Sequence, residues 1–334
     1  MANISSNLRI NLTGTESEPQ AAALRYQAAL DMAEYADAQG FSSVNVEEHH
    51  CAENGWLPSP LTMAAALAAR TEHCSIGIMA LLVTLYDPVR LAEDLAVIDL
   101  LSGGRLTFVA GMGYREKEFR AMDKPYATRG AWMDHVLDTL LAAWGDEPFE
   151  YNGQLINVTP KPFQRPHPMF LVGGMSKPAA RRAARRGLPF GPPIADPELE
   201  ALYYEELTKH GHSNGFVYTP PADFSVMFLH DDPEAAWDQL GHHFLVEAIE
   251  YSSWKEEGLQ RPLEFASSSV EALRAEARYE IITPQECIER HLNRAEFFAT
   301  VHPLIGGMPL DAGWDCLRLY AEQVLPTVRA ELKG

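Results

Sequence analysis

Short apolar runs alternate along the chain with longer segments whose apolar residues recur at helical spacing. The clearest run, 76–83, is almost continuously apolar, as expected of a parallel strand that is buried on both faces. Asp87 and Pro88 follow it and supply the N-cap and first-turn proline of a helix that reaches Leu100. The runs predicted to be strands are 8–12, 43–46, 76–83, 106–110, 169–172, 188–190, 224–229 and 300–305.

This alternation predicts a single α/β domain over residues 1–334. Strands that alternate with helices form right-handed βαβ units and a parallel sheet, and eight of them suggest closure into a (β/α)₈ TIM barrel. A doubly wound open sheet is the alternative. The last helix carries Trp314, Leu317 and Val324 on one face, and we predict that it ends at the Leu325-Pro326 break.

Two segments interrupt the alternation. Residues 149–158, with Asn152-Gly153 at their centre, predict an added β-hairpin. Residues 251–280 are charged, poor in strand signals and too long for an ordinary connection. We expect this insertion before the last strand to be a lid over the barrel mouth, because long loops in compact enzymes are commonly functional. A surface excursion without function is the alternative.

Charge and cysteine usage narrow the class of protein. The net charge of −19 opposes binding to nucleic acid or to an anionic membrane. Residues 1–10 lack the pattern of a signal peptide, and no apolar stretch approaches the ~20 residues of a membrane span. The cysteines, which show no C-x-x-C spacing, are Cys51, Cys74, Cys287 and Cys316. They are predicted to be free thiols, and we therefore expect a cytoplasmic protein.

A cluster of ionisable residues follows the second predicted strand: Glu47, Glu48, His49 and His50. In a parallel barrel the carboxyl ends of the strands form the active site, and a histidine there suits acid–base chemistry near neutral pH. Side chains alternate along an extended chain, so only one histidine can point into the mouth. A purely structural histidine pair is the alternative. No second cluster has metal-ligand spacing, so no metal is predicted.

Glycine-rich patches follow two later strands. One contains Gly111, Met112 and Tyr114, and the other is Gly173-Gly174-Met175-Ser176, which leads into a helix. Glycine lets backbone amides approach a ligand, and a helix N-terminus attracts an anion. Together the patches suggest a phosphorylated cofactor at one side of the mouth. Neither is a full G-x-G-x-x-G or P-loop, so the usual dinucleotide and triphosphate fingerprints are missing.

Several segments, taken in order, resemble the luciferase-like monooxygenase family. Residues 40–50, which end in Glu48-His49-His50, are similar to the family's second strand and its Glu-His-His ending. The other matching segments are 87–94, 101–105, 113–115, 118–119, Arg129, 283–287 and 319–326. The resemblance covers almost the whole chain, but it identifies no substrate.

The resemblance implies a reduced FMN at the barrel mouth, supplied by a separate flavin reductase, which reacts with O₂ to oxygenate a small organic substrate. It implies that His49 is the active-site base, that Ala80 lies against the flavin ring after a cis peptide bond from Met79, and that 173–176 bind the phosphate. Two positions depart from bacterial luciferase, which has an arginine at the position of Met112 and a cysteine at that of Gly111.

An FMN-dependent monooxygenase is therefore the leading interpretation. The alternatives are a hydride-transfer enzyme that uses the deazaflavin coenzyme F-420 and a flavin-binding protein without turnover. The alanine-rich helix predicted over 60–70 would let another helix approach closely. In the resembling family such helices form a two-fold interface, so we predict a homodimer.

Overall fold

The computed structural model describes residues 4–254, 268–294 and 297–332. At its centre lies a nine-stranded sheet in the order β10-β9-β11-β1-β2-β3-β4-β7-β8, with every neighbouring pair parallel. The strands are β1 (Ser5–Ile10), β2 (Ser43–Val46), β3 (Ser75–Leu82), β4 (Leu106–Gly111), β7 (Met169–Gly173), β8 (Phe190–Gly191), β9 (Val226–Leu229), β10 (Tyr279–Ile282) and β11 (Phe298–Val301).

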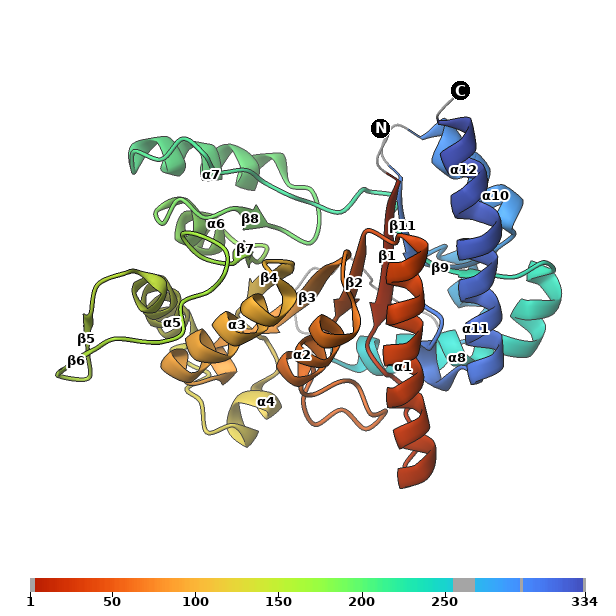
Figure 1. Ribbon diagram of the computed structural model, residues 1–334, viewed down its shortest axis with the longest axis horizontal. Coiled ribbons are helices and arrows are strands. Elements are labelled where there is room, and N and C mark those ends of the chain that lie inside the picture. Colours follow the sequence, from red (N-terminus) through yellow and green to blue (C-terminus); the bar gives the residue numbers. More distant parts are fainter. Residues whose placement is uncertain (1–3, 255–267, 295–296, 333–334) are drawn as a thin grey trace.

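Helices surround this sheet, and α1, α2 and α3 pack along the outside of β1 to β4 (Figure 1). Most begin with a proline in the first turn, and several have an N-cap side chain that accepts backbone N–H bonds. The helices are α1 (Pro19–Gln39), α2 (Pro60–Arg70), α3 (Pro88–Ser102), α4 (Glu116–Ala121), α5 (Arg129–Trp144), α6 (Lys177–Ala184), α7 (Pro197–Lys209), α8 (Pro233–Ser253), α9 (Val270–Ala275), α10 (Pro284–Asn293), α11 (Leu310–Arg318) and α12 (Leu325–Glu331).

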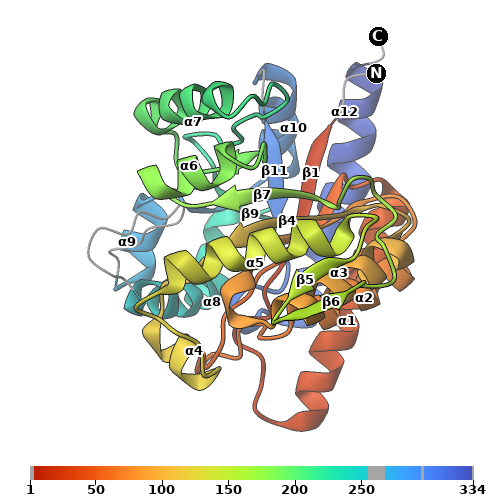
Figure 2. The ribbon, with the colours of Figure 1, turned by 90° about the vertical axis from the view of Figure 1, so that its left-hand side faces the viewer.

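The predicted α/β architecture with a parallel sheet is confirmed. The strand pairings of the described residues end at β8 on one side and at β10 on the other, so they do not by themselves close the barrel. At the β8 side the sheet continues only as an isolated bridge between Phe190 and Val217. The predicted hairpin is also present, as the antiparallel pair β5 (Phe149–Tyr151) and β6 (Gln154–Ile156), which lies outside the main sheet (Figure 2).

The segment predicted to be strand-poor, 251–280, requires a correction. Residues 255–267, which are part of the proposed lid, lie outside the described residues. Of the rest, 251–253 extend α8, 270–275 form α9, and Tyr279 begins the additional strand β10 beside β9. β10 has four residues, one of them Glu280, and it directly follows a charged stretch, so the sequence carries no apolar run that marks a strand there.

The carboxyl-terminal part differs from the prediction in two places. The predicted eighth strand, 300–305, is displaced to β11, because Pro303 has no N–H for the ladder and residues 305–307 form a 3₁₀ turn. The final helix does not end before Pro326. It widens into a π-helical segment, Leu319–Val324, and continues as α12 with Pro326 in its first turn, where the missing N–H is tolerated.

A half-buried histidine beside this π-helical segment gives a testable pH dependence. The His291 ring on α10 lies 2.9 Å from the Tyr320 hydroxyl, and burial lowers the pKa of His291 to about 4. An unfolded histidine titrates near pH 6.5, so between pH ~6.5 and ~4 the unfolded chain binds a proton that the folded chain excludes. The free energy of unfolding should therefore fall over this window by roughly 2–3 kcal/mol on account of His291.

Chemical denaturation of His291→Gln at pH 7, 5.5 and 4.5 checks this expectation. The variant should lose stability less steeply on acidification than the wild type does. His73→Gln is the matched control, since the His73 side chain is exposed. Identical slopes for the wild type and His291→Gln would contradict the assignment.

Candidate active site

His49 lies directly beyond β2, at the end of the sheet where the parallel strands terminate. Its Nδ1 is 3.1 Å from Oε1 of Glu118, which belongs to α4, the short helix that follows β4. The same oxygen accepts the backbone N–H of His50 at 3.0 Å and Nη1 of Arg115 at 2.9 Å. Since Arg115 also donates to the carbonyl of His50 at 2.9 Å, it links the loop after β2 to the loop after β4.

The electrostatics of this cluster define the role of each ring nitrogen. Burial raises the pKa of Glu118, but the bonds from His49 and the His50 amide, together with the Arg115 charge, outweigh it and hold the pKa below its ordinary value. An ionised carboxylate only accepts, so His49 donates through Nδ1. The Nε2 atom is then the one that can exchange a proton with a bound molecule.

Aromatic side chains from three parts of the chain surround the His49 ring, and we call them the ring wall. The distances between ring centroids and His49 are 4.4 Å for Trp254, 5.0 Å for Trp56, 6.0 Å for Tyr114 and 6.2 Å for Tyr251. The Arg115 guanidinium lies 3.9 Å from the centroid of Trp254. The wall leaves His49 only 8% exposed, so a proton exchanged here is shielded from bulk water.

His50 has different surroundings and anchors the loop. Its Nε2 lies 2.8 Å from Oε1 of Glu48, which also accepts the Tyr86 hydroxyl at 2.6 Å. The second oxygen of Glu48 accepts the N–H of Leu82 at 2.6 Å. These contacts tie the loop to the end of β3, and they leave His49 as the histidine that faces the ring wall.

Small residues form the inner face of β3 and β4 near this site. The Met79–Ala80 peptide bond is cis, as predicted from the resemblance. A Cβ on Gly111 would stand 3.1 Å from Cβ of Ala80, so the two residues face each other across adjacent strands. Ala80, Gly111, Val109 and Met79 are partly exposed although β3 and β4 lie within the sheet. Solvent therefore reaches a face that carries few bulky groups.

The remaining predicted cofactor residues occupy the same end of the sheet. The Met112 carbonyl accepts the Thr84 hydroxyl at 2.6 Å, and Met112 and Met175 pack against the core. Gly173 ends β7, and Gly174 follows with a φ of 139° that a side chain would strain. Ser176 is the N-cap of α6 and accepts the N–H of Ala179 at 3.3 Å.

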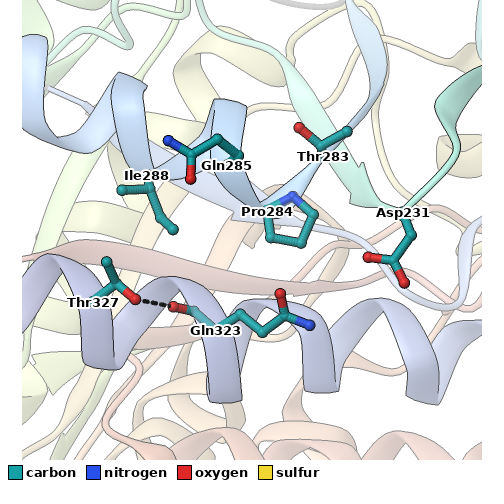
Figure 3. Close-up of a pocket in the computed structure, with 7 residues that line it drawn as sticks. All are labelled: Asp231, Thr283, Pro284, Gln285, Ile288, Gln323 and Thr327. Carbon is teal, nitrogen blue, oxygen red and sulfur yellow. Dashed lines mark hydrogen bonds between the residues drawn. The ribbon is translucent and has the colours of Figure 1, made fainter.

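One cavity lies apart from His49. It is an open groove of about 540 Å³ on the outer side of the sheet, between α10 and the last helix (Figure 3). Its lining residues are Asp231, Thr283, Pro284, Gln285, Ile288, Gln323 and Thr327. Within the described ranges, no group of three or more His, Cys, Asp or Glu side chains has metal-binding geometry. No described helix is long and apolar enough to cross a membrane.

The sequence located His49 but assigned no role to Glu118, and of the ring wall it singled out Tyr114 alone as a candidate site residue. Glu118 had one signal, since it lies in a segment that matches the family. Tyr251 and Trp254 lie in the segment predicted to be a lid, whereas Trp56 had no signal, because its approach to His49 depends on how the loop after β2 folds.

The structure thus combines a parallel α/β sheet, surrounding helices and a buried histidine–carboxylate pair beyond the strand ends. A sequence profile described as luciferase-like monooxygenase matches residues 8–300. The chain belongs to the luciferase-like monooxygenase family.

Curated relatives match about half of the chain. The alkanal monooxygenase beta chain of Vibrio harveyi is 27% identical over 192 residues, which are 54% of this chain and 59% of the relative. The FMNH₂-dependent dimethylsulfone monooxygenase of Pseudomonas putida is 30% identical over 172 residues, 46% and 45% of the two chains. The chain thus spans about half the length of the curated relatives it matches.

Solved structures share the fold over nearly the whole length. Monooxygenase RslO1 from Streptomyces bottropensis has a TM-score of 0.73 at 24% identity, with 97% of this chain and 99% of that chain covered. An F-420-dependent secondary alcohol dehydrogenase has a TM-score of 0.66 at 16% identity, with 97% and 99% covered. The likeness to both is one of fold.

Proposed function

We propose that this protein is a flavin-dependent monooxygenase that uses reduced FMN and O₂ to oxygenate a small organic substrate. The observation that carries the proposal is the His49–Glu118 pair enclosed by the ring wall at the carboxyl ends of the strands. The FMNH₂-dependent relative supports the choice of cofactor. A cytoplasmic location and a separate flavin reductase go with this function as predictions.

The described residues fit a flavin. Ala80 and Gly111 are partly exposed and carry a methyl group and no side chain, which leaves room for a planar ring system beside them. The Nε1 atom of Trp56 and Oε2 of Glu118 are buried without a hydrogen-bond partner among the described residues, which is typical of groups that meet a ligand. The amides at the start of α6, after Ser176, suit a phosphate. Reduced FMN bound here would activate O₂ for transfer of one oxygen atom.

The chain's own residues would then do three things. His49 exchanges a proton through Nε2, while Glu118 fixes the ring orientation and compensates a positive charge on it. The ring wall excludes water from the reacting atoms. Arg115 holds the loops after β2 and β4 together, so that His49 and Glu118 stay within hydrogen-bonding distance of each other.

The structural likeness to an F-420-dependent dehydrogenase supports hydride transfer with a deazaflavin as the second candidate. In that reaction the same His49 would serve as the proton donor or acceptor and O₂ would not be consumed.

Cofactor titration followed by oxygen measurement separates these functions. The purified protein is titrated with oxidised FMN, reduced FMN and reduced coenzyme F-420, and candidate small organic substrates are then added in air. Tight binding of reduced FMN with substrate-dependent uptake of labelled oxygen into product supports the monooxygenase. Oxygen-independent turnover with F-420 would establish the second candidate, and binding without turnover of any substrate would contradict both.

The assembly of the protein is a further prediction. On α2, Ala65, Ala66 and Ala69 are not fully buried, and on the adjacent α3 Leu100 and Leu101 are exposed. Small residues allow close helix approach, so we expect an isologous homodimer through α2 and α3. Light scattering at micromolar concentration should give twice the mass of one chain. Ala66→Arg should lower the mass to that of a monomer, and a wild-type monomer would refute the prediction.

A further inference from the structure

A fully buried carboxylate lies in the middle of α8, on the side that faces the sheet. The two oxygens of Glu247 accept five hydrogen bonds from residues that belong to β1, to the loop after it, to β10 and to the end of β11. The donors are Arg9 at 2.8 Å, Tyr279 at 2.7 Å, Asn11 at 2.9 Å, Thr13 at 2.6 Å and His302 at 3.2 Å. We call these six residues the Glu247 cluster.

Holding α8 by the Glu247 cluster requires the burial of charged groups, which costs free energy. Burial raises the pKa of Glu247, but the Arg9 charge and the other donors outweigh it and keep the pKa well below its ordinary value. Well-packed apolar side chains would hold α8 against the sheet at least as strongly. The carboxylate adds a geometric constraint on α8. Its donors come from different strands, so all of these hydrogen bonds can form only at one rotation of the helix about its axis and one position along that axis.

The helix that is fixed in this way carries part of the ring wall. Tyr251 lies four residues after Glu247, on the same face of α8, and Trp254 follows as the C-cap residue of the helix. A shift of one residue along the helix would rotate that face by about 100° and remove both rings from His49. Figure 1 shows α8 below β1 and β9, at the ends of the strands.

We infer that the Glu247 cluster is a positioning element of the active site: it sets α8 so that Tyr251 and Trp254 cover His49. The inference rests on the proposed function in one respect: the exclusion of water from the reaction is the reason for covering His49. The geometry itself is independent of cofactor and substrate, and it is tested without either.

The test measures access to His49 in Glu247→Gln. The amide keeps the shape but removes the charge and turns one acceptor into a donor. Carbethoxylation of His49 by diethyl pyrocarbonate, followed by mass spectrometry, should be about tenfold faster than in the wild type, as should amide exchange of residues 248–254. His73, which is exposed, serves as the internal reference for reagent reactivity.

The matched control is Glu250→Gln on the same helix, a residue outside the cluster, for which both rates should equal those of the wild type. A role confined to stability would speed exchange throughout the sheet, whereas positioning changes only α8 and His49. If Glu247→Gln does not fold, the same two rates are measured in Glu247→Asp, which keeps the charge on a shorter side chain, and both should again be faster than in the wild type. A folded variant with unchanged labelling of His49 would overturn the inference, and a negative oxygen assay alone would refute only the proposed function.

Discussion

Replacement of His49 by alanine is expected to lower the rate of product formation by roughly 10²–10⁴-fold and to leave flavin binding nearly intact. That range is usual for the loss of one acid–base group. His49 follows β2, whereas the predicted phosphate contacts lie on another part of the chain, after β7. Steady-state turnover with an identified substrate, together with a flavin titration, measures the two effects separately.

Two further variants distinguish proton exchange from structure. Glu118→Gln keeps a side-chain oxygen for Nδ1 but loses the charge, so turnover should fall less than in His49→Ala and the pH profile should change. His50→Gln should mainly lower stability, because His50 bonds to Glu48 within a structural network. Normal turnover by His49→Ala would show that the histidine is structural.

The fold was predictable where a local pattern is long enough to be read. Residues 76–83 are an almost unbroken apolar run, and parallel strands buried on both faces require such runs, so β3 was located nearly to its ends. β8 has only two residues and overlaps the predicted strand 188–190 at a single residue, and β10 was missed because its four residues include Glu280 and follow a charged stretch. Hydrogen bonds from neighbouring strands, rather than their own composition, make these segments extended.

The site was predictable only in part, for a related reason. His49 stands at a strand end, and strand ends meet at one edge of a parallel sheet, so its position followed from order along the chain. Its partner Glu118 lies 69 residues away, and two rings of its ring wall, Tyr251 and Trp254, lie more than 200 residues away. Only tertiary packing determines which distant side chains reach His49.

Glu247 shows that a polar residue can violate a helical pattern for a reason that the sequence does not reveal. Its neighbours Phe244 and Ala248 are buried, so the periodicity of α8 places a carboxylate on the apolar face. A sequence alone does not show that Arg9, from the first strand of the sheet, lies opposite. The local pattern therefore shows that Glu247 lies on an apolar helix face, and the structure shows that its partner is Arg9.

That partner leads to the largest expected effect on stability. Arg9 is buried between two carboxylates, with Nε 2.5 Å from Glu47 and Nη1 2.8 Å from Glu247. Arg9→Met keeps much of the side-chain volume but leaves the buried charge of Glu247 without its cation. Loss of one partner of a buried ion pair costs about 3–5 kcal/mol, so the free energy of unfolding should fall by that amount in urea titrations at pH 7.

A double-variant comparison shows whether the uncompensated charge is the cause. Adding Glu247→Gln to Arg9→Met removes that charge, so the double variant should be less destabilised than the sum of the two single variants. Arg70→Met is the control, because Arg70 pairs with Asp31 and Glu34 at the surface, where such pairs contribute about 0–1 kcal/mol. If Arg9→Met were no more destabilised than Arg70→Met, water or a rearranged side chain would have to compensate Glu247, and α8 would not depend on this ion pair.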